Sequence, residues 1–150
     1  MNKWHWRFIE MAKLVSTWSK DPSTQTGAVI VDRNNRVVSV GYNGFPRGVK
    51  DDKRLDDRDV KYEMVVHCEV NAIVTAQRDL SGCRLYTWPF MSCSRCASVV
   101  VQSGISECYA PESDNPRWVE SFALTRQIFE EGRVALFEMD LRYSPLPPML

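Results

Sequence analysis

The sequence has no surplus of charge of either sign and no long apolar run. Its 150 residues include 19 Lys and Arg against 19 Asp and Glu, so the formal net charge is zero. Without a basic surplus the chain lacks the charge that neutralises a row of phosphates, which argues against a long nucleic-acid partner. The first residues contain no apolar stretch of signal-peptide length, and nowhere do about eighteen apolar residues run together. We therefore expect a cytoplasmic protein that binds neither nucleic acid nor membrane.

The cysteines do not form the paired pattern of a disulfide scaffold. There are five, at positions 68, 83, 93, 96 and 108, which is an odd number. Cys93 and Cys96 form a C-x-x-C, a spacing more typical of metal or redox chemistry than of a disulfide framework. This pattern indicates a reducing compartment.

The composition is that of one domain. Hydrophobic residues make up 44% of the chain, which suffices for one ordinary core, and no internal repeat is present. Residues 144–150 are rich in proline and are expected to be extended or disordered. We expect a single domain over residues 1–143 followed by this tail.

The order of apolar and turn residues predicts an initial helix and hairpin, followed by alternating helices and strands. Apolar residues recur at three and four between positions 4 and 19, which indicates an amphipathic helix. Two β-branched runs at 27–31 and 36–40 flank a turn and predict an antiparallel hairpin. The elements expected next are a long loop over 41–61, a helix at 66–78, a strand at 84–87, a helix at 93–103, a strand at 107–110, a helix at 117–131 and a strand at 134–138. This order predicts an α/β sandwich around one sheet, with the last two strands parallel.

Two short motifs carry the candidate chemistry. His67-Cys68-Glu69 and Cys93-Ser94-Arg95-Cys96 each lie at the predicted start of a helix. One imidazole and two thiolates suit zinc, and three protein ligands leave a fourth position for water, as in catalytic rather than structural zinc sites. Helix N-termini favour negative charge, which lowers the cost of keeping Cys93 and Cys96 as thiolates. The motifs therefore predict a catalytic zinc held by His67, Cys93 and Cys96.

Glu69 lies two residues after His67, close to the predicted metal but not needed as a ligand. A carboxylate there can take a proton from water and deliver it to a substrate ring nitrogen and to departing ammonia. The signature of zinc-dependent nucleobase deaminases is H-x-E followed by P-C-x-x-C, and this chain matches all of it except the proline. The two motifs together thus predict hydrolytic deamination with Glu69 as the acid and base.

Two other kinds of site use the same residues. A structural zinc would need a fourth ligand. The remaining His and Cys side chains are His5, Cys68, Cys83 and Cys108. A redox dithiol would use Cys93 and Cys96 but would leave His67 and Glu69 without a role.

The neighbouring cysteines have separate interpretations. If Cys68 were the ligand in place of His67, Glu69 would follow it with no residue between, so His67 is favoured. Cys83 and Cys108 lie at the edges of predicted strands and are expected to be small buried apolar side chains.

Several blocks of the sequence resemble the deoxycytidylate deaminase family, within the cytidine deaminase-like superfamily. The resemblance runs from about Trp4 to Leu136. The blocks are SKDPSTQTGAVIVD at 19–32, GYNGFPRGV at 41–49, VVHCEVNAI at 65–73, SCSRCASVVVQSGI at 92–105 and RWVESFALTRQIFEEG at 117–132. The resemblance implies a three-layer α/β/α fold with a five-stranded mixed sheet.

The resemblance also implies an activity and an assembly. Enzymes of this family convert dCMP to dUMP with release of ammonia, which feeds thymidylate synthesis. They hold one catalytic Zn²⁺ per subunit and usually form homo-hexamers. Many are activated by dCTP, which would bring Mg²⁺ with it, and inhibited by dTTP. The alternatives are a deaminase of another cytosine nucleotide or nucleoside or of a base in RNA, and a non-catalytic zinc-stabilised subunit.

Carried over residue by residue, the resemblance assigns roles to both motifs. His67, Cys93 and Cys96 match the zinc ligands, and Glu69 matches the proton shuttle. The backbone amide of Cys68 is expected to bind the carbonyl of the base.

The segment from Gly41 to Gly44 matches a family loop near the nucleotide. Asn43 either contacts a sugar hydroxyl, because its amide can both donate and accept, or simply forms a turn with Gly44. Candidates for an effector or phosphate loop are Gly41, Tyr42, Gly44 and Arg47. The phosphate contacts themselves stay open between the charged segment 47–61, Arg95 and Arg117.

Two positions depart from the family pattern. Ser92 stands where the family usually has proline, and Cys68 stands where it usually has alanine. A serine before the first helical turn can cap it, so we expect Ser92 to accept a hydrogen bond from the Arg95 backbone amide. Cys68 is slightly larger than alanine, which bears on the tightness of the pocket and its sensitivity to oxidation rather than on the type of reaction.

Overall fold

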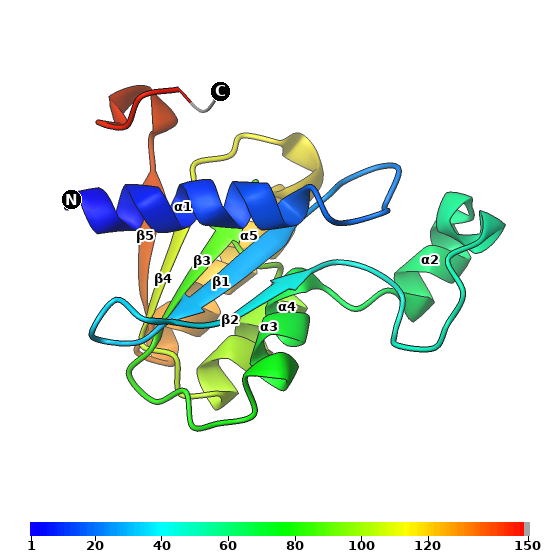
Figure 1. The fold of residues 1–150 in the computed structure, drawn as a ribbon, viewed down its shortest axis with the longest axis horizontal. Helices are drawn as coiled ribbons and strands as arrows, with labels where there is room; N and C mark the ends of the chain where they lie inside the picture. Colours follow the sequence, from blue (N-terminus) through cyan, green and yellow to red (C-terminus); the bar gives the residue numbers. More distant parts are fainter. Residues whose placement is uncertain (149–150) are drawn as a thin grey trace.

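A five-stranded mixed sheet is the centre of the computed structural model, which describes residues 1–148 (Figure 1). The strands are β1 (Gly27–Val31), β2 (Val37–Tyr42), β3 (Arg84–Trp88), β4 (Glu107–Pro111) and β5 (Ala135–Met139), in the order β2-β1-β3-β4-β5. Strand β1 is antiparallel to both of its neighbours, β2 and β3, whereas β3, β4 and β5 are parallel. This arrangement confirms the predicted fold class.

Helices cover both faces of the sheet. Helix α1 (Lys3–Ser16) packs on one face, and the other face carries α3 (Cys68–Ala76), α4 (Ser94–Gln102) and α5 (Val119–Glu131). The five residues of β1 are all buried because α1 covers one of its faces and α3 the other. Alternate side chains of a strand point to opposite faces, so Val29 and Val31 join the α1 core while Ala28 and Ile30 join the α3 core.

The predicted loop over residues 41–61 is wrong in its second half. Residues Lys53–Asp56 form a short 3-10 helix and Arg58–Met64 form helix α2, which projects away from the sheet (Figure 1). The side chain of Asp52 accepts a hydrogen bond from the Arg54 amide, and that of Asp57 accepts one from the Val60 amide. These acids therefore cap short helices in a segment that the sequence predicted to be a loop.

The ends of the chain and of two helices also differ from expectation. Helix α1 ends at Ser16 rather than Ser19, and α3 begins at Cys68 rather than position 66. In the predicted tail, Leu146 packs against the core under α1, while residues 149–150 lie outside the described residues.

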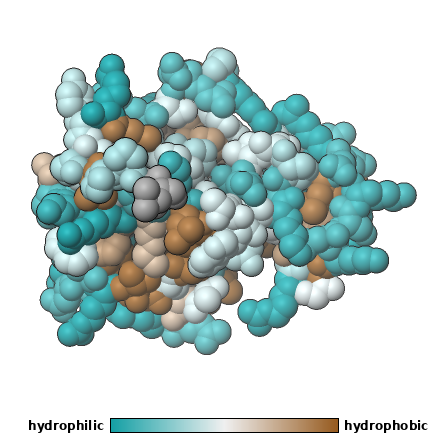
Figure 2. Space-filling model, turned by 45° about the horizontal axis from the view of Figure 1, so that its top comes forward, coloured by the Kyte–Doolittle hydropathy of each residue, from teal (hydrophilic) through white to brown (hydrophobic). Residues whose placement is uncertain are grey.

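The surface is mostly hydrophilic on the face drawn in Figure 2, where apolar residues show through in separate small areas. Within residues 1–148, none of the helices combines the length and the hydropathy that crossing a membrane requires.

Candidate functional site

The two predicted motifs meet at one edge of the sheet. Strand β3 ends at Trp88, and the chain then enters α4, whose N-cap is Cys93. The chain passes from the C-terminus of α3 into the start of β3. The N-terminus of α3, with His67 as its N-cap, therefore lies at the same edge as the end of β3. Ligand sites in α/β proteins occur outside the carboxyl ends of the strands, which is where this topology brings the two helix starts.

His67, Cys93 and Cys96 form a compact group. Their potential ligand atoms all lie within 4.8 Å of one another. His67 Nδ1 is 3.5 Å from Cys93 Sγ and 3.2 Å from Cys96 Sγ. Zinc lies about 2.3 Å from thiolate sulfur and about 2.0 Å from imidazole nitrogen, so the edges of a tetrahedral site are close to these separations.

The donor set of this group fits zinc. Neither His67 nor Cys93 makes the side-chain hydrogen bond that an N-cap residue usually makes, because both side chains turn toward the group instead. Within residues 1–148, no other His, Cys, Asp or Glu joins the group as a fourth ligand. Three ligands and one open position are typical of catalytic zinc.

The group already favours negative charge on sulfur. Hydrogen bonds from Cys96 and then from His67 lower the pKa of the Cys93 thiol to about 4, although burial opposes them. The pKa of Cys96 is raised, because its proton is shared with Cys93 and because it is buried. The pKa of His67 is raised, chiefly by its hydrogen bond with Cys93.

Glu69 lies in the first turn of α3 and is only 5% exposed. The buried Cys68 thiol donates a hydrogen bond to Glu69 Oε1, with sulfur and oxygen 2.9 Å apart. Cys68 thus faces the carboxylate, whereas His67 faces the two sulfurs. Glu69 Oε2 has no hydrogen-bond partner among residues 1–148, which leaves it for water and ligand.

The expected capping role of Ser92 is wrong. Cys93 is the N-cap of α4, and the buried Ser92 instead accepts a hydrogen bond at its carbonyl from the Thr125 hydroxyl. Ser121 Oγ, from α5, accepts the hydrogen bond of the Ser94 amide at 3.0 Å. A cap from a distant helix has no local sequence signal, so the sequence did not indicate Ser121.

Residues 41–44 hold the start of α3 in place. Gly41 lies directly against the backbone of α3, so that a Cβ there would be 2.3 Å from the Cys68 carbonyl oxygen. Gly44 and Val66 exchange two backbone hydrogen bonds, of 3.1 and 2.8 Å, immediately before His67. Asn71 of α3 donates to the Tyr42 carbonyl at 2.8 Å. This segment therefore sets the position of the His67 motif.

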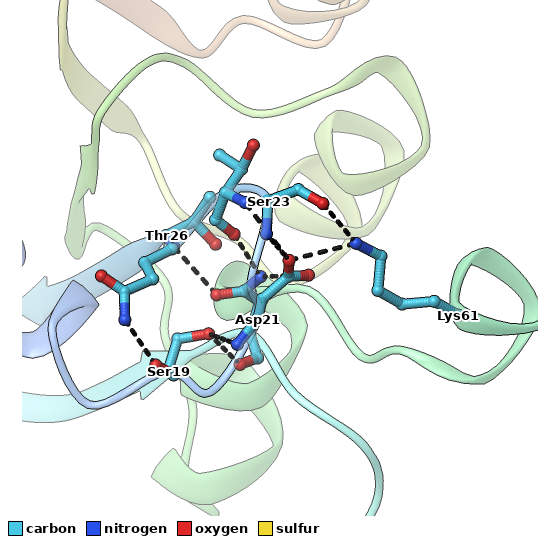
Figure 3. Close-up of polar contacts among 8 residues, drawn as sticks. Ser19, Asp21, Ser23, Thr26 and Lys61 are labelled. Carbon is cyan, nitrogen blue, oxygen red and sulfur yellow. Dashed lines mark hydrogen bonds and ion pairs between the residues drawn. The ribbon is translucent and has the colours of Figure 1, made fainter. Parts of the chain in front are cut away.

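Asn43 is built into a network of hydrogen bonds with residues 21–26. Figure 3 shows Asp21, Thr26 and Lys61 of this network. Its amide nitrogen donates to the Thr24 carbonyl at 2.9 Å and to Asp21 Oδ2 at 3.4 Å, and its Oδ1 accepts from the Thr26 amide at 2.8 Å. The same Asp21 accepts at Oδ1 from Lys61 Nζ at 3.1 Å, in an ion pair whose side chains are both 7% exposed. Asn43 thus shapes the pocket wall, and a contact with a sugar hydroxyl stays a prediction.

A pocket opens over these groups, and we call it the inner pocket. Its polar lining includes Glu69, His67, Cys93, Thr26 and Asn43. Its apolar lining includes Trp88, Phe90, Met91 and Trp118, and the last belongs to an aromatic cluster with Phe90 and Phe122. The effector-loop candidates Gly41, Tyr42, Gly44 and Arg47 do not line this pocket.

An outer pocket shares four lining residues with the inner one, namely Ser23, Lys61, Tyr62 and Arg117. Of the open phosphate candidates, Arg117 and Lys61 therefore border both pockets, while Arg47 and Arg95 border neither. The buried pair of Lys61 and Asp21 was missed, because it joins two segments that are forty residues apart in the sequence.

Comparisons with known proteins agree with this geometry. Residues 2–111 match the family model of the cytidine and deoxycytidylate deaminase zinc-binding region. A deaminase from the luxG 3′ region of Aliivibrio fischeri, described as uncharacterized, is 46% identical over 137 residues, which cover 89% of this chain and 92% of the relative. Deoxycytidylate deaminase of Mus musculus is 36% identical over 151 residues, covering 96% of this chain and 84% of the relative.

The fold is similar to that of a solved deaminase. The crystal structure of dCMP deaminase from the cyanophage S-TIM5, in complex with dCMP and dUMP, has a TM-score of 0.73 to this chain. The two are 23% identical, and the match covers 89% of this chain and 94% of that chain. At this identity the similarity shows the fold.

Proposed function

The chain belongs to the cytidine and deoxycytidylate deaminase zinc-binding family, and we propose that it deaminates dCMP to dUMP with release of ammonia. The observation that carries the proposal is the group of His67, Cys93 and Cys96 in one pocket with the buried Glu69. The relatives named deoxycytidylate deaminase support dCMP as the substrate.

His67, Cys93 and Cys96 would hold zinc, which when bound supplies a Lewis acid that activates water at neutral pH. The reaction joins the oxygen of water to C4 of the cytosine ring and breaks the bond from C4 to the amino nitrogen. Glu69 takes a proton from the water and donates it to N3 of the ring. It then takes the remaining proton of the added oxygen and moves it to the amino nitrogen, so that a carbonyl forms at C4 and ammonia leaves.

The surroundings of Glu69 suit this role. Cys68 donates a hydrogen bond to one carboxylate oxygen, which leaves the other to exchange protons with water and the base. The Cys68 backbone amide is at the first position of α3, where backbone amides lack helical partners, and there it binds the carbonyl of the base. The ring lies between the aromatic walls of the inner pocket, which exclude bulk water from the reacting carbon.

The substitution Glu69→Gln tests the proton shuttle, because glutamine keeps the shape of the side chain but cannot accept the proton. We expect the variant to keep its zinc and its unfolding midpoint while kcat for dCMP falls by about 10²- to 10⁴-fold. Ammonia release and bound zinc are both measured on the purified zinc-loaded proteins. Turnover near that of the wild type would contradict the role of Glu69.

The same assay tests the substrate when dCMP, dCTP, deoxycytidine and CMP are compared in parallel. Preference for dCMP supports the proposal, and preference for another of these compounds moves the substrate while leaving the four site residues in their roles. Absence of turnover on all four would overturn it. The activation by dCTP and inhibition by dTTP that the resemblance implies are tested by adding each to the dCMP reaction.

A further inference from the structure

The segment that carries Cys93 is held by hydroxyl groups from another helix. Thr125 of α5 donates a hydrogen bond to the Ser92 carbonyl at 2.8 Å. Ser121 of the same helix accepts one from the Ser94 amide at 3.0 Å. Ser121 and Thr125 are four positions apart, so they lie on adjacent turns of one face of α5. This face of α5 therefore holds the backbone directly before and directly after a proposed metal ligand.

The Ser121 contact supplies a cap that Cys93 does not make. The first amides of a helix have no partner within the helix, and the N-cap side chain usually accepts from one of them. The Cys93 side chain makes no such hydrogen bond, and its sulfur lies with the ligand atoms of His67 and Cys96 instead. Ser121 Oγ accepts from the Ser94 amide, and its own proton goes to Ser94 Oγ at 3.4 Å. The start of α4 is thus satisfied while the Cys93 sulfur is left for a metal.

The Thr125 contact is buried. Thr125 is 0% exposed, and Ser92 is only 3% exposed. Water cannot replace the donor of a carbonyl at such a site, so loss of the Thr125 hydroxyl would favour movement of the segment. Valine has nearly the size of threonine but no hydroxyl. Thr125→Val therefore removes this hydrogen bond with little change in packing.

Apolar contacts fix α5 against the same segment. Phe122 of α5 belongs to one buried cluster with Met91, and its ring centre lies 5.5 Å from that of Phe90. Near the other end of α5, Phe129 is buried in the core that this helix shares with α3, α4 and the sheet. Both ends of α5 are therefore anchored, which gives its two hydroxyl groups fixed positions relative to the Cys93 segment.

We propose that Ser121 and Thr125 are positioning residues for the metal, because they hold Cys93 where it can bind zinc together with His67 and Cys96. The inference rests on the ligand assignment within the proposed function. A ligand that is in place before the metal arrives loses little conformational freedom on binding, so it binds more tightly. Groups that orient metal ligands contribute about 10- to 100-fold to metal affinity. Ser121 and Thr125 act on one ligand through its backbone, so the lower value is expected for each.

Zinc affinity tests this inference without using turnover. Each purified protein competes for zinc with a chromophoric chelator under reducing conditions, which gives the Kd for zinc. We expect this Kd to rise about 10-fold in Thr125→Val and in Ser121→Ala. Thr125→Ser keeps the hydroxyl and should recover most of the affinity that Thr125→Val loses.

Ser39→Ala is the matched control. Ser39 of β2 is buried, and its hydroxyl donates to the Ala72 carbonyl at 2.6 Å, more than one helical turn beyond His67 in α3. It therefore makes the same kind of contact as Thr125 but not beside a ligand. We expect Ser39→Ala to lower the urea midpoint of unfolding, as Thr125→Val does, and to leave the Kd for zinc unchanged. This comparison separates positioning of a ligand from general stabilisation.

The outcomes also separate this inference from the proposed function. Wild-type zinc affinity in both Thr125→Val and Ser121→Ala, or an equal loss of affinity in Ser39→Ala, would overturn the positioning role. If Thr125→Val does not fold, Ser121→Ala decides alone, because Ser121 is only partly buried. A wild type that binds zinc but does not deaminate dCMP would overturn the proposed function, and the Kd values would still decide the positioning role. Failure of the wild type to bind zinc would overturn both.

Discussion

His5 shows at the scale of one residue how burial links protonation to stability. It is 9% exposed, its Nδ1 lies 2.7 Å from the Tyr86 hydroxyl, and its ring stacks on that of Tyr109 at 4.1 Å. Burial lowers the pKa of His5, the nearby charge of Arg84 lowers it further, and Glu107 opposes the shift. The charged form of His5 is therefore disfavoured in the folded protein.

The sign of the resulting pH dependence follows from that shift. A histidine whose pKa is lowered by folding binds its proton more readily in the unfolded chain, so stability is lost as pH falls below about 6.5. We expect the free energy of unfolding to be lower at pH 5.5 than at pH 7.5, with a slope from His5 of at most about 1.4 kcal/mol per pH unit. Urea unfolding of the zinc-loaded protein at both values measures it.

His5→Gln is the variant that isolates this contribution. Glutamine keeps a hydrogen-bonding group near Tyr86 but does not titrate, and His67 is present in both proteins, so its own titration cancels in the comparison. The variant should lose part of the pH slope. Equal slopes in the two proteins would show that His5 does not contribute.

At the scale of elements, the contact between residues 41–44 and α3 decides where the His67 motif lies. We expect Gly41→Ala to lower the free energy of unfolding by about 1–3 kcal/mol, because its Cβ would be 2.3 Å from the Cys68 carbonyl oxygen and 2.4 Å from the Ala72 amide nitrogen. Both neighbours are backbone atoms, so relief requires a shift of the whole helix. Chemical denaturation measures the change.

The same substitution three residues later is the control. A Cβ at Gly44 meets nothing within 4 Å, so Gly44→Ala should change the free energy of unfolding by less than about 0.5 kcal/mol. If the two variants were equally stable, the close approach of this segment to α3 would not be the constraint that we describe.

At the scale of the whole molecule, zinc would tie two helices together. Its proposed ligands are the N-cap of α3, the N-cap of α4 and a residue within α4. A ligand that binds only the folded chain adds about 4 kcal/mol at a thousand times its Kd. For a domain of this size we expect removal of zinc by a chelator to lower Tm by roughly 10 °C, as measured by calorimetry.

Two cysteine variants sharpen this prediction. Cys96→Ser should bind little zinc and should melt at the same temperature with and without chelator. Cys83→Ala is the matched control, because Cys83 is buried but lies outside the metal group, so its zinc content and response to chelator should match the wild type. Full zinc content in Cys96→Ser would refute the ligand assignment.

Local sequence patterns sufficed to predict the parts of the protein that depend on neighbours along the chain. The β-branched runs and the helical periodicity predicted all five strands and the four longer helices, because the spacing of buried apolar side chains differs between strands and helices. The H-x-E and C-x-x-C spacings identified His67, Glu69, Cys93 and Cys96 as candidates for the site, because each motif is complete within four residues. Their roles in catalysis stay a proposal. The hexamer and the effectors stay predictions too, because they involve more than one chain or a further ligand.

Contacts between groups that are distant in the sequence follow only from the packing of the folded chain. The Ser121 hydroxyl caps α4 from another helix, and Lys61 pairs with Asp21 across forty positions of sequence, so neither contact has a periodic signal. Helix α2 is short and capped by Asp57 in a segment of mixed charge, where local pattern does not separate a helix from a loop. The junction of the two pockets follows from these contacts. Packing between segments far apart in the chain sets such positions, and local residue preferences do not encode it.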